Sequence, residues 1–333
     1  MTASAIEFDV IGLGNAIVDV LTEADDRILE RLDLAKGMMT LVDRERMSAL
    51  YGGIGPAVEM SGGSCANTMA ALASLGARAA YVGKVQNDQL GEVFQHDIGA
   101  SGVTFTTPPL GEGPPTARCL VLVTPDAQRT MATYLGACVE LGPKDVDEAQ
   151  VAAAKVVYLE GYLWDRPNAK AACIKAAEVA HRHGRQVALT LSDPFCVDRW
   201  RGEFADLIGK HVDILIANEV EICSLYGANR FDDVIDMVRN EVAVAALTRG
   251  ADGSVIVAGD AVHRLAAAPI EQLVDTTGAG DLYAAGLLYG LTNDLQLDQC
   301  ARLGGLSAAH VLGHYGARAA TPLVPLVDVA RSG

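Results

Sequence analysis

A seven-residue string near the C-terminus, Asp275-Thr276-Thr277-Gly278-Ala279-Gly280-Asp281, combines residues that could hold an anion with one that could accept a proton. Its two glycines and alanine leave backbone N–H groups uncovered where the apolar stretch that follows predicts a helix. Free N–H groups and the positive end of a helix dipole form an anion site. A carboxylate beside that site could take the proton of a hydroxyl attacking a bound phosphate. Asp281 is also a favoured capping residue, so a purely structural role stays open.

The elements that would position this string alternate along the chain. Short β-branched runs are expected to be strands, at 8–12, 80–85, 156–160, 187–191, 214–217, 242–248 and 254–257, with a further strand-like run at 272–274. Amphipathic segments between them are expected to be helices, at 66–75, 89–101, 168–183, 219–226 and 232–239. This alternation predicts a mostly parallel sheet covered by helices on both faces, whose ligands lie beyond the carboxyl ends of the strands.

Two blocks interrupt the alternation. After Gly14 the chain continues as strand instead of opening a helix, and the block from 104 to 135 contains two strands without a helix of their own. We expect a single domain over residues 1–333. In it, about 15–45 and 104–135 form a small β-sheet lid, and the remainder forms the α/β core.

The composition excludes several classes of protein. The 333 residues carry 26 Lys and Arg against 42 Asp and Glu, a net charge of −16, so the mean field repels nucleic acid and anionic membranes. Seven scattered cysteines without a CxxC pair argue against a disulfide framework and a thiolate zinc site. The N-terminus does not read as a secretion signal and no run is apolar enough for a membrane span. We expect a cytoplasmic protein without nucleic-acid or membrane partners.

The Asp275–Asp281 string resembles the C-terminal signature of the ribokinase (PfkB) family of carbohydrate and nucleoside kinases. The N-terminal signature of that family is similar to Ser61-Gly62-Gly63-Ser64 followed by Asn67. The resemblance implies a ribokinase-like three-layer α/β/α fold with a β-sheet lid, and an ATP-dependent phosphotransferase that uses Mg²⁺. It also implies that Asp281 is the catalytic base and that the amides of Gly278, Ala279 and Gly280 form an anion hole.

Further roles follow from the same resemblance. Asp19 corresponds to an aspartate that accepts hydrogen bonds from two neighbouring sugar hydroxyls, which suits the two oxygens of a carboxylate. The substrate-binding residues implied are Asn15, Asp19, Gly62, Gly63, Asn67 and Tyr162. Taken without the family, Gly62-Gly63 is equally an ordinary glycine turn with an exposed asparagine after it.

The nucleotide side is implied by two turns. The residues concerned are Asn218 and Glu221, which would order phosphates and Mg²⁺ through water, and Thr248, Gly250 and Gly253, which would contact the nucleotide. By themselves these are an acidic first helical turn and an ordinary turn between strands.

The resemblance gives the lid and the anion loop two more groups. Arg129 would reach from the lid to the transferred phosphate, or else be a surface charge. Asp275, Thr277 and Gly316 would bind a monovalent cation such as K⁺.

Several local strings favour the adenosine kinase branch, with the 5′-OH of adenosine as acceptor, AMP as product and purine salvage as the setting. They include Gly14-Asn15 ahead of Asp19, and Tyr162-Leu163, which stands where that branch has two phenylalanines. A kinase for another nucleoside or for a sugar such as ribose or fructose stays open. So do a non-catalytic ligand sensor and an NAD-dependent oxidoreductase, the last disfavoured because Gly12-Leu13-Gly14 is an incomplete dinucleotide fingerprint. The sequence is compatible with a monomer or with a homodimer formed through the lid.

Overall fold

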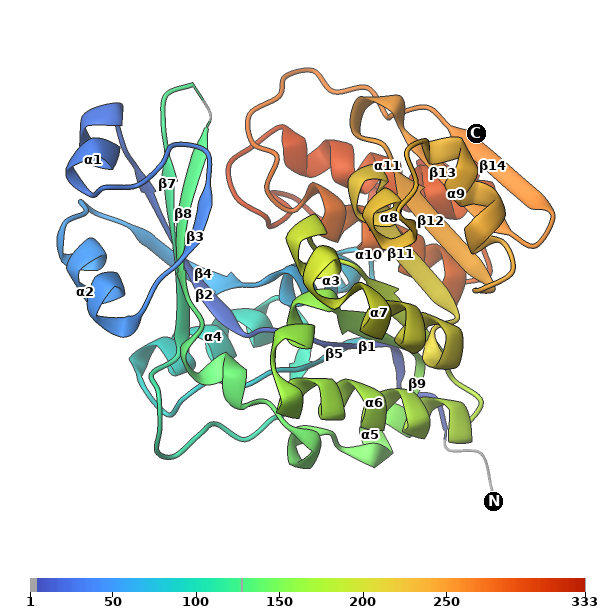
Figure 1. Ribbon diagram of the computed structural model, residues 1–333, viewed down its shortest axis with the longest axis horizontal. Coiled ribbons are helices and arrows are strands. Elements are labelled where there is room, and N and C mark those ends of the chain that lie inside the picture. The colour runs from blue at the N-terminus through green and yellow to red at the C-terminus, as the bar shows by residue number, and fades with distance from the viewer. Residues whose placement is uncertain (1–4, 127, 333) are drawn as a thin grey trace.

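The computed structural model describes residues 5–126 and 128–332. A nine-stranded sheet forms its centre, in the order β14 (Ala261–Leu265), β13 (Ser254–Ala258), β12 (Val244–Thr248), β11 (Ile214–Asn218), β10 (Gln186–Thr190), β9 (Ala154–Glu160), β1 (Phe8–Leu13), β5 (Ala79–Val82) and β6 (Thr104–Phe105) (Figure 1). Neighbouring strands from β12 to β6 are parallel, while β13 and β14 add an antiparallel edge. The predicted mostly parallel sheet is confirmed.

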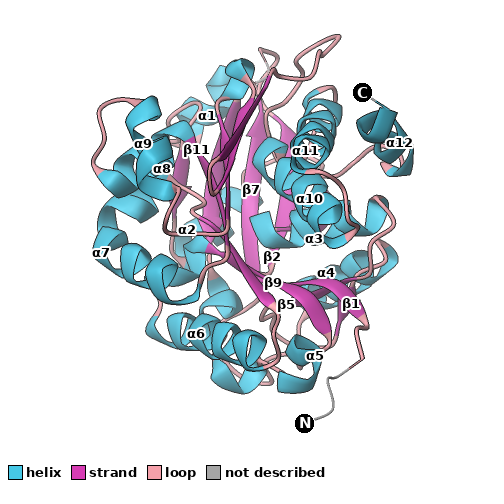
Figure 2. Ribbon diagram, turned by 90° about the vertical axis from the view of Figure 1, so that its right-hand side faces the viewer, coloured by secondary structure: helices cyan, strands magenta, loops and turns pink. Residues whose placement is uncertain are grey.

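Helices cover both faces of this sheet (Figure 2). One face packs against α5 (Glu148–Ala152), α6 (Pro167–Arg182), α7 (Pro194–His211), α8 (Glu219–Tyr226) and α9 (Phe231–Val238). The other face packs against α3 (Ser64–Ser74), α4 (Gln89–Ala100), α10 (Ala279–Thr292), α11 (Leu297–Leu312) and α12 (Val324–Ser332). Side chains alternate between the two cores along each strand, as Val10 and Ile11 of β1 do. The described helices include none with the length and apolar character that a bilayer crossing needs.

A second, five-stranded sheet stands beside the large one (Figure 1). Its order is β3 (Met39–Leu41), β8 (Arg129–Tyr134), β7 (Ala117–Val123), β2 (Ile17–Glu23) and β4 (Val58–Gly62), and α1 (Asp26–Arg31) and α2 (Arg44–Gly52) cover its outer face. This sheet differs from the expected lid in two places. β4 lies beyond 15–45 because its backbone pairs with β2, and β6 lies within 104–135 but pairs with β5 in the large sheet.

The expected core strands and helices are present, with the exception of the run at 272–274. That segment forms no strand, because the Val274 N–H donates to the carbonyl of Leu312 at the end of α11 instead of to a neighbouring strand. The remaining described elements are the short 3-10 helices η1 (Gly136–Glu140), η2 (Pro143–Asp145), η3 (Gly161–Asp165) and η4 (Gly250–Asp252).

Candidate active site

Asp281 lies in the first turn of α10, and its carboxylate is held by another helix. Oδ1 accepts a hydrogen bond from Ser64 Oγ at 2.6 Å, and Oδ2 accepts one from Asn67 Nδ2 at 3.0 Å. Both donors come from the first turn of α3, and among the described residues no backbone amide of α10 donates to this carboxylate. Capping of α10 therefore does not account for Asp281. Burial raises the pKa of Asp281, while the bonds from Ser64 and Asn67 and the charge of Arg318 lower it.

Asn67 keeps one polar atom unused. Its Nδ2 is bound to Asp281, but its Oδ1 is buried and has no hydrogen-bond partner among the described residues. A buried acceptor without a donor costs free energy, so such an atom marks a place where a ligand hydroxyl could donate.

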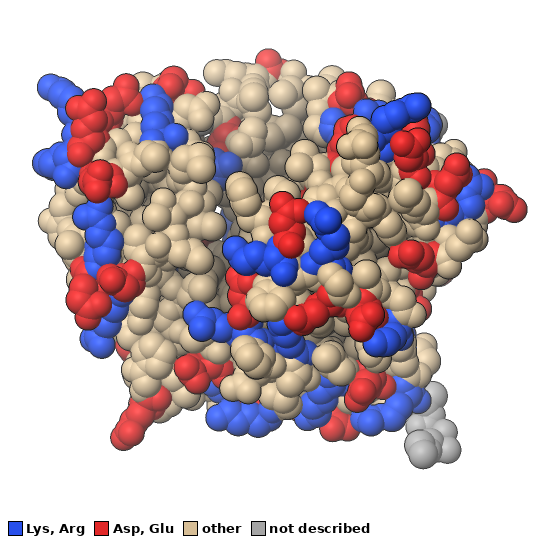
Figure 3. All heavy atoms as spheres, viewed as in Figure 1, with Lys and Arg blue, Asp and Glu red and all other residues tan. Residues whose placement is uncertain are grey.

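The turn before α10 has the form of an anion cradle. Gly278 adopts a left-handed conformation with φ of 77°, and a Cβ there would lie 2.8 Å from the Ala317 Cα. A Cβ at Gly280 would meet no atom within 4 Å, and in the described part of the chain no group accepts from the Gly280 N–H. In the space-filling view, the surface is hollowed between the five-stranded sheet and the rest of the molecule (Figure 3).

Arg129 reaches this turn from the five-stranded sheet. Its Nε lies 2.7 Å from Asp275 Oδ1, and its Nη2 donates to Thr276 Oγ1 at 3.1 Å. The structure thus places the Arg129 guanidinium beside the anion cradle, paired with the aspartate that opens the string.

Asp275 joins the residues that were expected to bind a monovalent cation. Its Oδ1 accepts from Thr277 N, Thr277 Oγ1 and Arg129 Nε, and its Oδ2 accepts from Gly316 N at 2.9 Å. Oδ1 thus has three donors, whereas Oδ2 has one and keeps a further lone pair. Arg129 brings positive charge to Oδ1, and binding of a monovalent cation by Asp275, Thr277 and Gly316 stays a prediction.

The substrate side of the site is built on close backbone approaches. A Cβ at Gly62 would lie 2.2 Å from Asp19 Oδ2, and a Cβ at Gly63, whose φ is 93°, would lie 2.2 Å from the Asn15 carbonyl oxygen. The glycine pair therefore lets the loop after β1 and strand β2 pack directly on the turn between β4 and α3. Burial raises the pKa of Asp19 to about 7, with Arg318 lowering it and Asp281 raising it further.

Gly63→Ala should destabilise the protein by about 1–3 kcal/mol, because alanine at positive φ is strained and its Cβ would overlap the Asn15 carbonyl. Gly99→Ala, near the end of α4 and with open space around its Cβ, is the matched control and should gain up to about 1 kcal/mol. Urea unfolding measures both. Equal free energies of unfolding for the two variants would contradict the packing described here.

Glu160, at the carboxyl end of β9, links the loop after β1 to the first turn of α3. Its Oε1 accepts from the N and Nδ2 of Asn15 at 3.2 and 2.7 Å, and its Oε2 accepts from the Cys65 N–H at 2.9 Å. The pKa of Glu160 is raised to about 7, because the effect of burial exceeds that of these three bonds, which lower it. Asn15 is therefore bound to protein through its amide nitrogen, which leaves its Oδ1 as the atom that could meet a ligand.

The nucleotide residues lie at the carboxyl ends of β11 and β12, where Asn218 and Thr248 are register partners. Asn218 caps α8, and its N and Nδ2 donate to the two carboxylate oxygens of Glu221. Each Glu221 oxygen keeps a further lone pair, which fits a magnesium contact through water better than direct ligation. Burial raises the pKa of Glu221 to about 7. Gly250 and Gly253 have positive φ in the turn that contains η4.

Tyr162 lies in η3, and its hydroxyl is bound to the backbone of Ser192. Its hydroxyl donates to the Ser192 carbonyl at 3.2 Å, and burial raises its pKa. Ser192 itself has a φ of 71°, in the left-handed region that serine rarely occupies. The bond fixes the Tyr162 ring beside the ends of β9 and β10.

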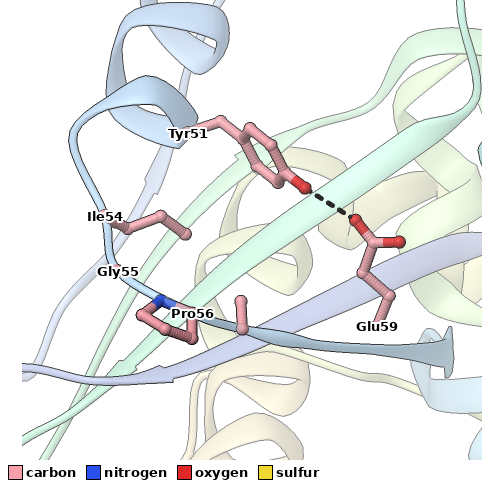
Figure 4. A pocket seen from close by; sticks show the side chains of 6 residues that line it. Tyr51, Ile54, Gly55, Pro56 and Glu59 are labelled. Carbon is pink, nitrogen blue, oxygen red and sulfur yellow. Dashed lines mark hydrogen bonds between the residues drawn. The ribbon is translucent and has the colours of Figure 1, made fainter.

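Two features lie outside this group of residues. A surface pocket of about 450 Å³ on the five-stranded sheet is lined by Tyr51, Ile54, Gly55, Pro56, Ala57 and Glu59, with a hydrogen bond from Tyr51 Oη to Glu59 (Figure 4). It contains none of the predicted site residues. Within residues 5–126 and 128–332, no group of three or more His, Cys, Asp or Glu is placed to hold a metal ion directly.

Sequence reasoning missed one central residue, Arg318. Its guanidinium donates to the carbonyls of Ser61 and Ala66, and so sits against the turn that carries Gly62, Gly63 and Ser64. The partners are more than 250 residues away in sequence, and no local pattern around Arg318 points to them.

The comparisons with known proteins identify the family of this chain. The model of the pfkB family of carbohydrate kinases matches residues 56–323, and the chain belongs to this family. It is therefore a kinase, a phosphotransferase, and the predicted family and ribokinase-like fold are confirmed. The oxidoreductase alternative is wrong.

The relatives of this chain include both sugar kinases and an adenosine kinase. A probable sugar kinase from Rhizobium etli is 48% identical, with a TM-score of 0.92 over 98% of this chain and 99% of that one. The adenosine kinase from Sinorhizobium meliloti is 51% identical, with a TM-score of 0.91 over 97% and 99%. A 5-dehydro-2-deoxygluconokinase from Geobacillus kaustophilus is 25% identical over 80% of this chain and 83% of its own length.

Proposed function

We propose that this kinase transfers the γ-phosphoryl group of ATP to the 5′-OH of adenosine and so forms AMP, as an enzyme of purine salvage. The observation that carries the transfer chemistry is the Asp281 carboxylate, held by Ser64 and Asn67 beside the open Gly280 amide. The choice of adenosine rests on the 51% identity to the Sinorhizobium meliloti adenosine kinase over nearly the whole chain.

In this proposal, each residue acts through the contact that its position allows. Asp19 accepts hydrogen bonds from the 2′ and 3′ hydroxyls of the ribose, and Asn67 Oδ1 accepts from a further hydroxyl. Asp281 takes the proton of the 5′-OH as its oxygen attacks the phosphorus. The Gly280 amide donates to the phosphoryl oxygens, where charge develops, and the Ala279 amide joins it by leaving its 3.4 Å contact with the Thr276 carbonyl. Bound Mg²⁺ supplies neutralisation of the phosphate charge, and Glu221 and Asn218 would hold the ion through water.

Arg129 has two partners in the proposal. Paired with Asp275, it closes the five-stranded sheet over the cradle, and from the same place its guanidinium is able to turn to a phosphoryl oxygen. Closure removes water that would otherwise compete as the phosphate acceptor. Whether the protein is a monomer or a homodimer through the exposed edges of the five-stranded sheet stays a prediction.

A sugar kinase is the second candidate, because the Rhizobium etli protein is called a probable sugar kinase at nearly the same identity. The deciding experiment measures ADP release from ATP with adenosine, inosine, ribose, fructose and 5-dehydro-2-deoxygluconate, and identifies the phosphorylated product. We expect the highest kcat/KM for adenosine with AMP as product. A sugar with a higher kcat/KM than adenosine would replace the proposal. If none of the compounds in the panel supported ADP release, both candidates would be refuted.

Adenosine binding should strengthen as the pH rises from 6 to 8. The ionised Asp19 carboxylate is the form that accepts two hydroxyls, and its pKa of about 7 leaves it mostly protonated at pH 6. The dissociation constant should therefore fall by up to about 10-fold over this interval, as expected when binding must first remove a proton. Calorimetric titration of Asp281→Asn without ATP isolates Asp19 from the neighbouring carboxyl. Adding Asp19→Asn to this variant should flatten the profile, and a profile that stays equally steep would assign the titration elsewhere.

A further inference from the structure

The Arg318 guanidinium binds residues before and after the turn between β4 and α3. Its Nη2 donates to the Ser61 carbonyl and to Ser61 Oγ, both at 2.7 Å, its Nε donates to the same carbonyl at 3.2 Å, and its Nη1 donates to the Ala66 carbonyl at 3.0 Å. Ser61 is the penultimate residue of β4, and Ala66 lies in the first turn of α3. Between them stand Gly62 and Gly63, which pack on Asp19 and Asn15, and Ser64, which binds Asp281.

The positive charge of Arg318 is not cancelled by a direct ion pair. Within the described residues, no carboxylate oxygen lies within 4.0 Å of its nitrogens. Its nearest link to a carboxylate runs through Ser61, which accepts from Arg318 and donates its hydroxyl and its N–H to Asp97 on α4. The charge of Arg318 therefore acts through space on three nearby carboxylates, most strongly on Asp97 and then on Asp19 and Asp281.

The segment that carries Arg318 also supports the anion cradle. Two residues earlier, the Gly316 N–H donates to Asp275, and between them Ala317 packs against Gly278. Arg318 thus joins the C-terminal segment behind the cradle to the turn that holds Asp281 and Asp19.

The other ionisable groups that face Asp281 do not supply a positive charge. They are Asp19 on β2, Tyr158 and Glu160 on β9, Tyr162 in η3 and Cys65 on α3. Burial raises the pKa of both tyrosines and of the cysteine, so they stay neutral, and the two carboxyls oppose ionisation of Asp281. Arg318 acts in the opposite direction on Asp281 and Asp19, and Arg129 does so on Asp19.

We propose that Arg318 is a positioning residue of the kinase, which clamps the β4–α3 turn under Asp281 and sets a positive charge behind the Asp281 and Asp19 carboxylates. The inference rests on the proposed role of Asp281 as proton acceptor. It assigns two separable tasks to one side chain, and these predict different consequences for kcat and for its pH dependence.

The test is the pH profile of kcat in Arg318→Met and Arg318→Lys, with the best acceptor of the panel. Methionine removes both tasks, so kcat should fall by about 10-fold at its optimum through misplacement of the turn. The acid limb of the profile, where kcat falls as the pH is lowered, should also move to higher pH by about one unit, because a neighbouring opposite charge is lost. Lysine keeps the charge but cannot span Ser61 and Ala66, so its kcat should fall while its acid limb stays at the wild-type position.

A second readout needs no substrate, and so separates failure of this inference from failure of the adenosine proposal. Without Arg318, the folded-state pKa of the two carboxyls rises further while the unfolded-state values stay the same. The Met variant should therefore lose more unfolding free energy at pH 8 than at pH 5.5. Arg78→Met, which breaks a pair with Asp9 at the opposite end of β1, should lose a pH-independent amount over the same interval and keep the wild-type acid limb.

An acid limb that does not move in Arg318→Met, together with a constant stability loss from pH 5.5 to 8, would overturn the electrostatic role. If Arg318→Met does not fold, Ser61→Ala and Arg318→Lys still test the clamp. Ser61→Ala removes one acceptor of Arg318 and should lower kcat at every pH. Wild-type kcat in both variants would overturn the clamp.

Discussion

Asp281→Asn should lower kcat by about 10²–10⁴-fold, the usual contribution of a positioned general base, and leave acceptor binding nearly unchanged. The substitution keeps the shape of the side chain and removes its basicity. Ser64 can still donate to the remaining oxygen. Asn67 has a buried Oδ1 without a partner, and a turn of its amide lets that atom accept from the new Nδ2, while the Asn67 Nδ2 then donates to the ligand hydroxyl in place of the Oδ1 that accepted from it. The fold should therefore tolerate the change, and the loss should be confined to the transfer step.

Initial rates of ADP formation give kcat, and calorimetry gives the dissociation constant of the acceptor. Asp294→Asn is the matched control because it makes the same chemical change at the other end of α10. Asp294 is exposed and has a φ of 59°, which asparagine adopts readily. A kcat of Asp281→Asn close to the wild-type value, or an equal loss in Asp294→Asn, would remove Asp281 from the reaction.

The anion cradle was predictable from sequence because its geometry is local. Gly278 needs a left-handed conformation, the free amides need a helix that starts at once, and both requirements are written in consecutive residues. The prediction of a strand at 272–274 was wrong because strand formation is not a local property. These residues have strand character, but a strand exists only where a neighbouring strand pairs with it, and here the neighbour is the end of α11.

The partners of the site residues were not predictable, because they depend on contacts between distant segments. Asp281 and Ser64 are 217 residues apart, and Glu160 and Asn15 are 145 apart. Arg129 was correctly expected to lie in the β-sheet beside the site, yet its pairing with Asp275 joins segments that no periodicity relates. A sequence shows which residues could take part in chemistry and where strands end. It does not show which side chains are hydrogen-bonded to one another in the fold.

Two long helices were missed for a physical reason. α7 carries a kink at Trp200, which interrupts its apolar period, and α11 contains the helix-weakening pair Gly304-Gly305. The reason for a glycine at 304 is visible only in the folded protein, where a Cβ at this position would lie 2.9 Å from the Tyr283 carbonyl oxygen of α10. Close packing of α10 on α11 therefore requires a residue that, by itself, argues against a helix.

Asp19→Asn should lower kcat/KM for adenosine by about 100-fold, since a lost charge-assisted hydrogen bond costs roughly 1.5–3 kcal/mol. The carboxylate offers acceptors to both ribose hydroxyls, whereas an amide offers an acceptor to only one. Gly62 packs directly against this side chain and leaves little room for it to move away from the ligand.

The diagnostic measurement compares adenosine with 2′-deoxyadenosine in wild type and variant. The wild-type enzyme should prefer adenosine, and Asp19→Asn should lose most of that preference, because the hydroxyl and the carboxylate oxygen that binds it form one interaction. Glu59→Gln is the control: this carboxylate lies on the adjacent strand β4 and binds Tyr51, away from the site. If Asp19→Asn loses activity equally toward both nucleosides, the carboxylate does not bind the ribose 2′-hydroxyl, and the proposed role of Asp19 would be refuted.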